Sequence, residues 1–242
     1  MRDYNVETSK RVEFIRKILS DSGNLGIVYG NSGGKDATLV GILCKMACDN
    51  TVGLIMPAGS NQNYGSDIDD ATKTALQFNI ETRTVDLKAA FEAMKSAIGQ
   101  AAELTDATIT NIAPRLRMTT LYAVAQSEGR LVAGTGNKSE AYMGYFTKWG
   151  DGAHDFNPIS DLTVTEIYEF LAHLGASESI INKAPSAGLF DGQTDEGEMG
   201  ITYKAIDEFI LTGVATDEDK AIIERYHRVS EHKRNPIVTF VK

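Results

Sequence analysis

Up to about residue 145, the chain alternates between short runs of hydrophobic residues and segments in which hydrophobic residues recur at helical spacing. The short runs are rich in β-branched side chains and are predicted as strands over residues 26–30, 51–57, 81–86 and 130–135. The segments of helical spacing predict helices over residues 35–48, 66–78, 87–99 and 114–128. This alternation indicates an α/β protein with a doubly wound, mostly parallel sheet flanked by helices.

The pattern is less regular after about residue 145. A segment rich in Gly and Asp, FTKWGDGAHDFNP, precedes a predicted helix over residues 163–174, a loop reading PSAGLFDGQTDEGEMG and two further helices. That loop is longer than a compact domain normally contains without a functional reason. No linker rich in Pro or Ser and no repeat divides the 242 residues, so we expect a single domain spanning residues 1–242.

Composition and charge narrow the class of protein. The formal net charge of -9 argues against a nucleic-acid-binding surface, which needs clustered Lys and Arg. The sequence contains no run of about 18 apolar residues and no secretory signal, so we expect no membrane segment and a cytoplasmic location. Cys44 and Cys48 lie on one predicted helix without a histidine cluster, and are interpreted as reduced, buried thiols rather than zinc ligands.

The stretch YGNSGGKDATLV, at residues 29–40, lies at a predicted strand-to-helix junction. Its two adjacent glycines let the backbone approach an anion, and the positive end of the following helix points to the same place. The stretch therefore predicts a phosphate-binding loop, although its spacing matches neither GxxxxGK[ST] nor GxGxxG. A plain helix N-terminus capped by Ser32 is the alternative interpretation.

Four motifs together carry a resemblance to a known family. SGGKD resembles the SGGxDS loop of the ATP pyrophosphatases. GTGNKSEAYMGYFTKWGDGAHDFNPI, KAPSAGLFDGQTDEGEMGITYKAIDEF and EHKRNPI are similar, in order and spacing, to the ammonia-dependent NAD synthetases, so that the match runs from about Gly26 to Pro236. The resemblance implies the adenine nucleotide alpha hydrolase-like fold of the ATP pyrophosphatases. It also implies a two-step ligase: the carboxylate of deamido-NAD attacks the α-phosphorus of ATP and releases pyrophosphate, and ammonia then displaces AMP to give NAD.

The resemblance also implies which residues form the site. The ATP phosphates would contact the loop residues Gly30, Asn31, Ser32, Gly33, Gly34, Lys35, Asp36 and Ala37. Asp36 and Glu140 would hold magnesium (Mg²⁺), and Ser32 would act with them in catalysis; Thr135 and Ser186 would contact the adenosine of ATP. Deamido-NAD would contact Arg115, Lys148, Asp155, His232 and Lys233. Because the deamido-NAD site of the family lies at a two-fold interface, a homodimer is also implied.

The chain departs from the family pattern at two positions of the ATP site. Ala37 replaces a Ser or Thr at the end of the loop, and Val164 replaces a lysine that contacts phosphate. Either Lys35 supplies the missing charge or its side chain points to solvent; Lys138 is a second candidate. Two alternative functions stay open: an adenylating enzyme of the same superfamily with another acceptor and, because of these two departures, a nucleotide-binding relative with impaired catalysis.

Overall fold

The computed structural model describes residues 2–59, 64–183, 185–186 and 194–240. Its centre is a four-stranded, all-parallel sheet with the strand order β3-β2-β1-β4. The strands are β1 (Gly26–Gly30), β2 (Thr51–Ile55), β3 (Glu81–Thr84) and β4 (Arg130–Ala133). β1 pairs with β2 on one side and with β4 on the other, so the direction of winding reverses at β1. Open α/β sheets bind ligands beyond the carboxyl ends of their strands at such a point.

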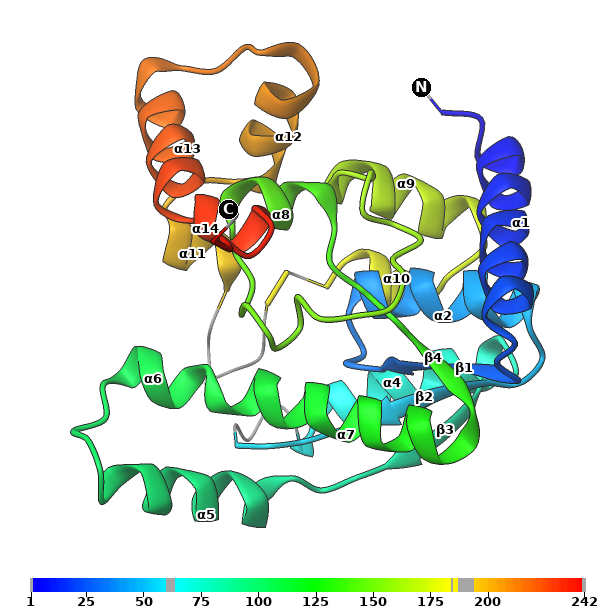
Figure 1. The fold of residues 1–242 in the computed structure, drawn as a ribbon. Coiled ribbons are helices and arrows are strands. Elements are labelled where there is room, and N and C mark those ends of the chain that lie inside the picture. Colours follow the sequence, from blue (N-terminus) through cyan, green and yellow to red (C-terminus); the bar gives the residue numbers. More distant parts are fainter. Residues whose placement is uncertain (1, 60–63, 184, 187–193, 241–242) are drawn as a thin grey trace.

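Helices cover both faces of the sheet, because successive side chains of each strand point to opposite faces. Ile27 and Tyr29 of β1 belong to a core shared with α1 (Tyr4–Ser22), α2 (Lys35–Ala47), α4 (Ser66–Gln77) and α9 (Val164–His173). Val28 belongs to a second core, shared with α5 (Lys88–Gly99) and α7 (Ile112–Glu128) on the other face (Figure 1). The structure thus confirms the doubly wound α/β fold that the hydrophobic pattern predicts.

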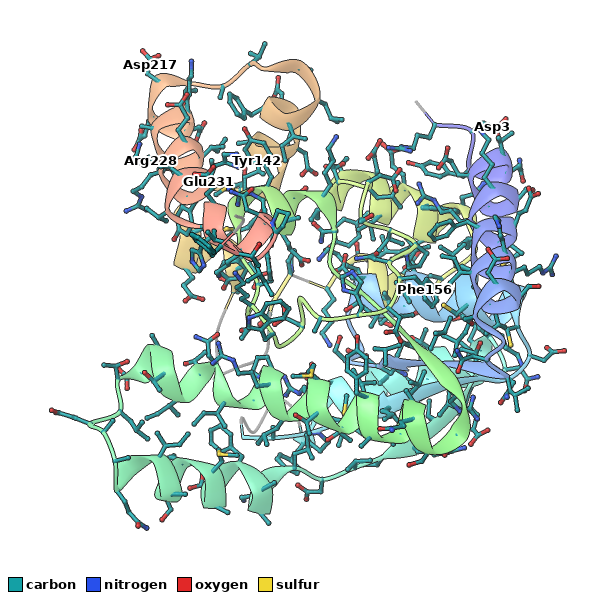
Figure 2. All side chains as sticks on the ribbon, in the orientation of Figure 1. Asp3, Tyr142, Phe156, Asp217, Arg228 and Glu231 are labelled. Atoms are coloured by element: carbon teal, nitrogen blue, oxygen red, sulfur yellow. The ribbon has the colours of Figure 1, made fainter. Side chains whose placement is uncertain are left out.

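A smaller group of helices packs beside this α/β core and is called the helical lobe here. It contains α8 (Lys138–Met143), α11 (Asp195–Met199), α12 (Tyr203–Thr212), α13 (Asp217–Val229) and α14 (Glu231–Arg234) (Figure 1). Its core includes Met143, Met199, Tyr203 and the first residue of α9, Val164. Tyr142 of α8, labelled in Figure 2, stacks on His227 of α13 with ring centroids 4.2 Å apart. The lobe is joined to the α/β core through α8 and α9.

Two short helices complete the described elements: α6 (Asp106–Thr110) precedes α7, and α10 (Glu178–Ile181) follows α9. Among the described residues, no helix has both the length and the apolar character that crossing a membrane requires.

Candidate active site

The loop between β1 and α2 is a tight turn that requires glycine. Gly33 adopts a positive φ of 71°, and a Cβ at this position would lie 2.5 Å from the backbone oxygen of Asp67 in α4. Gly34 is the N-cap of α2 and has no side chain to cap the helix. Ser32 instead accepts a hydrogen bond from the Gly34 N–H at 3.3 Å. The N-terminus of α2 therefore has no side-chain cap at Gly34, an arrangement that suits the phosphate-binding loop expected from the sequence.

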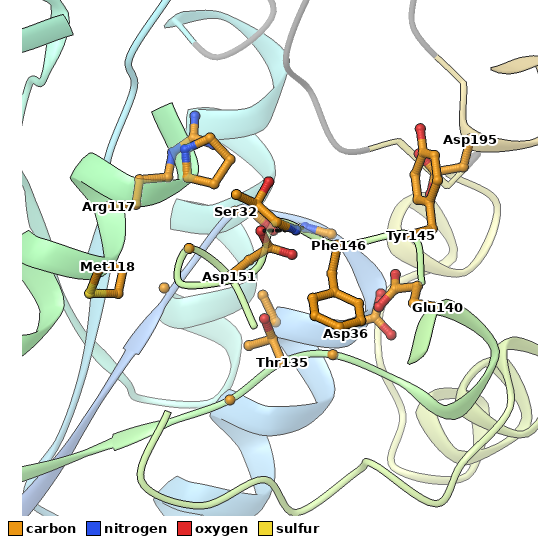
Figure 3. Close-up of a pocket in the computed structure, with 18 of the residues that line it drawn as sticks. Ser32, Asp36, Arg117, Met118, Thr135, Glu140, Tyr145, Phe146, Asp151 and Asp195 are labelled. Atoms are coloured by element: carbon orange, nitrogen blue, oxygen red, sulfur yellow. Dashed lines mark hydrogen bonds between the residues drawn. The ribbon is translucent and has the colours of Figure 1, made fainter. Parts of the chain in front are cut away.

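Two carboxylates from different loops meet beside this turn. Asp36 lies in the first turn of α2, and Glu140 lies in the first turn of α8, which follows β4. Asn137 connects them: its side-chain amide donates to Asp36 Oδ1 at 3.0 Å, and its backbone N–H donates to Glu140 Oε2 at 3.0 Å. Figure 3 shows the two carboxylates next to each other. They meet because β1 and β4 are parallel neighbours whose carboxyl ends share one edge of the sheet.

The two carboxylates and Lys35 form a charged cluster. Burial raises the pKa of Glu140, and the Asp36 carboxylate raises it further; the Lys35 ammonium opposes both effects. Only 6% of Lys35 is exposed, and its Nζ lies 2.7 Å from Asp36 Oδ2. Burial lowers the pKa of Lys35, but the carboxylates of Asp36 and Glu140 more than compensate and the pKa is raised. The alternative in which Lys35 points to solvent is therefore wrong.

The donor set at this cluster fits a hard cation. Asp36 and Glu140 offer carboxylate oxygens, the ligand type that magnesium prefers, beside a turn built for phosphate. In the part of the chain that the structure describes, no group of three or more His, Cys, Asp or Glu side chains is arranged to hold a metal ion by itself. A site with two protein carboxylates therefore needs phosphate oxygens and waters to complete its coordination.

A cavity of about 720 Å³ opens over this cluster, large enough for a nucleotide. Its walls include the glycine loop, the end of β2, the segment after β4, and the turns at residues 144–147 and 150–153. Most of the predicted ATP contacts line it: Gly30, Asn31, Ser32, Gly34, Lys35, Asp36, Ala37, Thr135 and Ser186. Arg117 and Met118 lie on one side of the cavity, and Tyr145 and Asp195 on the other (Figure 3). The sequence motifs thus meet around one cavity.

Residues 7–242 match the family model for NAD synthase. The chain belongs to the NAD synthase family. A protein of Carboxydothermus hydrogenoformans named NH3-dependent NAD+ synthetase is 44% identical, over 96% of each chain. Two solved structures superpose on this chain over nearly the full length. One is an NMN synthetase from Francisella tularensis, with a TM-score of 0.93, 36% identity and 99% of both chains covered. The other is an NH3-dependent NAD synthetase from Campylobacter jejuni, with a TM-score of 0.82, 30% identity and 100% of both chains covered. These matches confirm the family and fold that the sequence motifs indicate.

Four of the five residues predicted to bind the acceptor in this NAD synthase-family chain lie near one another. Lys148 Nζ donates to the backbone oxygen of His232 at 2.5 Å, and Arg115 donates to the backbone oxygen of Lys148 at 3.4 Å. Lys233 Nζ donates to the backbone oxygens of Gly144 and Phe146 at 2.7 and 2.6 Å, and it lines the cavity. The other three are not among the described residues that line it. Of the four, the structure therefore places only Lys233 in the cavity wall.

Asp155, the fifth predicted acceptor contact, lies elsewhere. Its Oδ2 accepts the backbone N–H of Val132 at 2.7 Å, and its Oδ1 accepts the Tyr122 hydroxyl at 3.3 Å. Val132 belongs to β4, an edge strand, and the next residue of the segment, Phe156, forms a parallel bridge to Ala133 (Figure 2). Asp155 thus satisfies a backbone donor at the sheet edge. Its contact with an acceptor stays a prediction that this arrangement does not support.

Two predicted ATP contacts also lie away from the cavity. Gly33 faces α4 rather than the cavity, so its role is to permit the tight turn of the loop. Val164 is 3% exposed in the core of the helical lobe, and its N–H donates to Ser139 Oγ at 3.3 Å. Because Val164 is apolar and buried, the prediction that it lies in the ATP site is not supported. In the loop predicted around Ser186, residues 184 and 187–193 lie outside the described residues.

Sequence reasoning assigned no site role to three residues that line the cavity: Lys183, Arg117 and Asp195. Lys183 Nζ forms ion pairs with Asp67 and Asp70 of α4 at 2.9 and 2.8 Å, and it reaches the backbone oxygen of Gly33 at 3.4 Å. Arg117 Nε donates to the backbone oxygen of Met56 at 3.0 Å, and burial lowers the pKa of Arg117. The Tyr203 hydroxyl donates to the buried Asp195 at 3.1 Å. Lys183 is the first residue of the KAPSAG motif, and that motif was the sequence signal that could have identified it. The acidic partners of Lys183 lie far away in the sequence.

Proposed function

We propose that this protein adenylates the carboxylate of deamido-NAD with ATP and amidates it with ammonia, giving NAD, AMP and pyrophosphate. One observation carries the proposal: a chain of the NAD synthase family brings the Asp36 and Glu140 carboxylates together beside a phosphate-type glycine loop, in one nucleotide-sized cavity. ATP, deamido-NAD and ammonia would be its small-molecule substrates.

The proposed chemistry follows from the poor reactivity of a carboxylate. An oxygen of the acceptor carboxylate attacks the α-phosphorus of ATP, and the bond from that phosphorus to the bridging oxygen of pyrophosphate breaks. Ammonia then attacks the acyl carbon, and AMP leaves with the former carboxylate oxygen. The amides of the glycine loop and the N-terminus of α2 would hold the departing pyrophosphate. Magnesium, held by Asp36 and Glu140 with phosphate oxygens, would withdraw negative charge from the phosphates as this bond breaks.

A second acceptor is favoured by a specific observation. The Francisella tularensis structure with a TM-score of 0.93 is titled an NMN synthetase, whereas the NH3-dependent NAD synthetase from Campylobacter jejuni superposes with a TM-score of 0.82. Nicotinate mononucleotide carries the same carboxylate and lacks only the adenylate half of deamido-NAD. Both acceptors would present the same reacting group to the cavity, so the choice depends on contacts to the second half.

A competition assay separates the two acceptors. Equal concentrations of deamido-NAD and nicotinate mononucleotide are incubated with the protein, ATP, magnesium and ammonium, and all products are quantified by chromatography. The proposal expects NAD to exceed NMN by at least about tenfold, together with equimolar AMP. Predominant NMN would assign the mononucleotide as acceptor. No AMP with either acid would contradict the proposed reaction.

We expect free ammonium, rather than glutamine, to be the nitrogen donor. Release of ammonia from glutamine requires an activated nucleophile such as a thiolate. The sequence contains two cysteines, Cys44 and Cys48; Cys44 is buried, and burial raises the pKa of its thiol, which disfavours the thiolate. Glutamine, freed of ammonium, should support less than about 1% of the ammonium-dependent rate. Robust amidation with release of glutamate would contradict this expectation.

Lys233→Met should weaken acceptor binding while leaving ATP binding unchanged. Lys233 lines the cavity from α14, beside the turn at residues 144–147. Loss of a charge-assisted contact to an anionic acceptor should raise the acceptor KM about tenfold or more, with the ATP KM changed by less than about twofold. Steady-state kinetics measure both constants, and Lys220→Met, an exposed lysine of α13 3.9 Å from Glu224, is the matched control. Equal effects on both KM values, or none, would remove Lys233 from the acceptor site.

A further inference from the structure

Lys35 is a buried cation in the wall of the cavity. It is the first residue of α2, and its Nζ lies 2.7 Å from Asp36 Oδ2 and 5.6 Å from the centre of the Tyr203 ring. A buried ammonium is strongly destabilising unless a partner compensates its charge. Among the described residues, this ammonium donates to the Asp36 carboxylate, and the Glu140 carboxylate lies in the same cluster. Lys35 therefore offsets part of the negative charge of the two carboxylates that are suited to a metal ion.

We propose that the Lys35 ammonium has two successive partners: the Asp36 carboxylate in the nucleotide-free protein, and the phosphates of ATP in the complex. The proposal rests on the proposed function, because it requires ATP to occupy this cavity.

Lys35 would exchange the Asp36 carboxylate for phosphate because magnesium and Lys35 compete for the same carboxylate. Its Oδ1 accepts the Asn137 amide at 3.0 Å, and its Oδ2 is paired with Lys35. Magnesium binds a carboxylate oxygen at about 2.0–2.1 Å, and it would repel an ammonium that stays on the same oxygen. Phosphate oxygens at the N-terminus of α2 offer the displaced ammonium a new anionic partner within the same cavity. Lys35 is therefore an internal competitor of the metal before ATP binds and a ligand of ATP afterwards.

Two binding measurements on Lys35→Met test the proposal without relying on turnover. Binding of Mn²⁺ as a magnesium probe is followed by electron paramagnetic resonance without nucleotide, and binding of ATP with magnesium, in the absence of any acceptor acid, is followed by calorimetry. Without the competing ammonium, Mn²⁺ affinity should rise about three- to tenfold. Without the phosphate contact, ATP affinity should fall about ten- to hundredfold. Lys45→Met, at the other end of α2, where Lys45 donates to the backbone oxygen of Asp49, should change neither.

A second substitution completes the test. If Lys35→Met does not fold, as judged by circular dichroism, Lys35→Gln keeps a hydrogen-bonding group and should show the same two shifts. Wild-type affinities for both Mn²⁺ and ATP in a folded variant would overturn the proposal. Failure of the wild-type protein to bind ATP at all would instead contradict the proposed function.

Discussion

Asp36→Asn and Glu140→Gln should each lower kcat/KM for ATP by about a hundred- to thousandfold. Both substitutions remove a charge but keep the shape of the side chain, so the Asn137 contacts and the capping box of α8 have matching acceptors. The double variant should lose little more than either single variant, because two groups that hold one ion act as a unit. Steady-state kinetics over a range of magnesium concentrations measure these effects.

Glu166→Gln is the matched control for Glu140→Gln. Glu166 occupies the same position in the capping box of α9, where its Oε2 accepts the Thr163 N–H at 2.9 Å, but it pairs with Arg2 instead of lining the cavity. Its kcat/KM should stay within about twofold of the wild type, while thermal stability decreases modestly. Near-normal turnover of the Asp36 or Glu140 variants at limiting magnesium, or additive losses in the double variant, would remove the metal assignment.

Gly33→Ala should reduce ATP affinity by at least about a hundredfold, because the loop cannot keep its shape. The new Cβ would lie 2.5 Å from the backbone oxygen of Asp67, so either the loop or α4 must move, and the positive φ of 71° adds strain. Calorimetric titration with ATP measures the loss, and a thermal melt reports stability.

Gly129→Ala separates backbone strain from the clash. Gly129 also has a positive φ, 62°, but nothing lies within 4 Å of the position of its Cβ. This variant should lose roughly 1–2 kcal/mol of stability and bind ATP like the wild type. If Gly33→Ala binds ATP as well as Gly129→Ala does, the turn is not the phosphate-binding element.

The strands could be predicted from the sequence, but most of their ends could not. β1 spans residues 26–30 as predicted, whereas β2, β3 and β4 each end two residues before the predicted end. The hydrophobic run continues through Met56 and Pro57, although a proline has no N–H for the ladder. After Ala133, the Gly134 N–H turns to the backbone oxygen of Phe156 at 2.8 Å instead of continuing along β1. Local composition does not reveal where a strand changes its partner.

The N-terminal helix α1 was missed for a related reason. Asp3 caps its start and Gly23 ends it, so the terminal signals were present. Its position depends on Arg11, which is buried and donates to Asp161 and to the backbone oxygen of Pro158. Those partners lie about 150 residues further along the chain, beyond the reach of any local pattern.

The candidate site could be predicted where motif and topology agree. Asp36 and Glu140 follow strands that proved to be neighbours, so the structure brings them together. Val164 and Asp155 were chosen by motif position alone. The Val164 side chain packs in the core of the helical lobe, and the Asp155 carboxylate accepts a backbone hydrogen bond at the edge of β4. Lys183 was missed because its ion-pair partners lie on α4, and the motif that contains Lys183 gives no information about that helix.

The central claim is that the acceptor carboxylate becomes an acyl-adenylate, and transfer of ¹⁸O tests it most directly. The acceptor acid is labelled with ¹⁸O in both carboxylate oxygens and incubated with the protein, ATP, magnesium and ammonium in unlabelled water. The proposed reaction predicts AMP with one ¹⁸O atom per molecule, unlabelled pyrophosphate and an amide that keeps the other ¹⁸O. Unlabelled AMP beside the amide product, or ¹⁸O in pyrophosphate or inorganic phosphate, would contradict it.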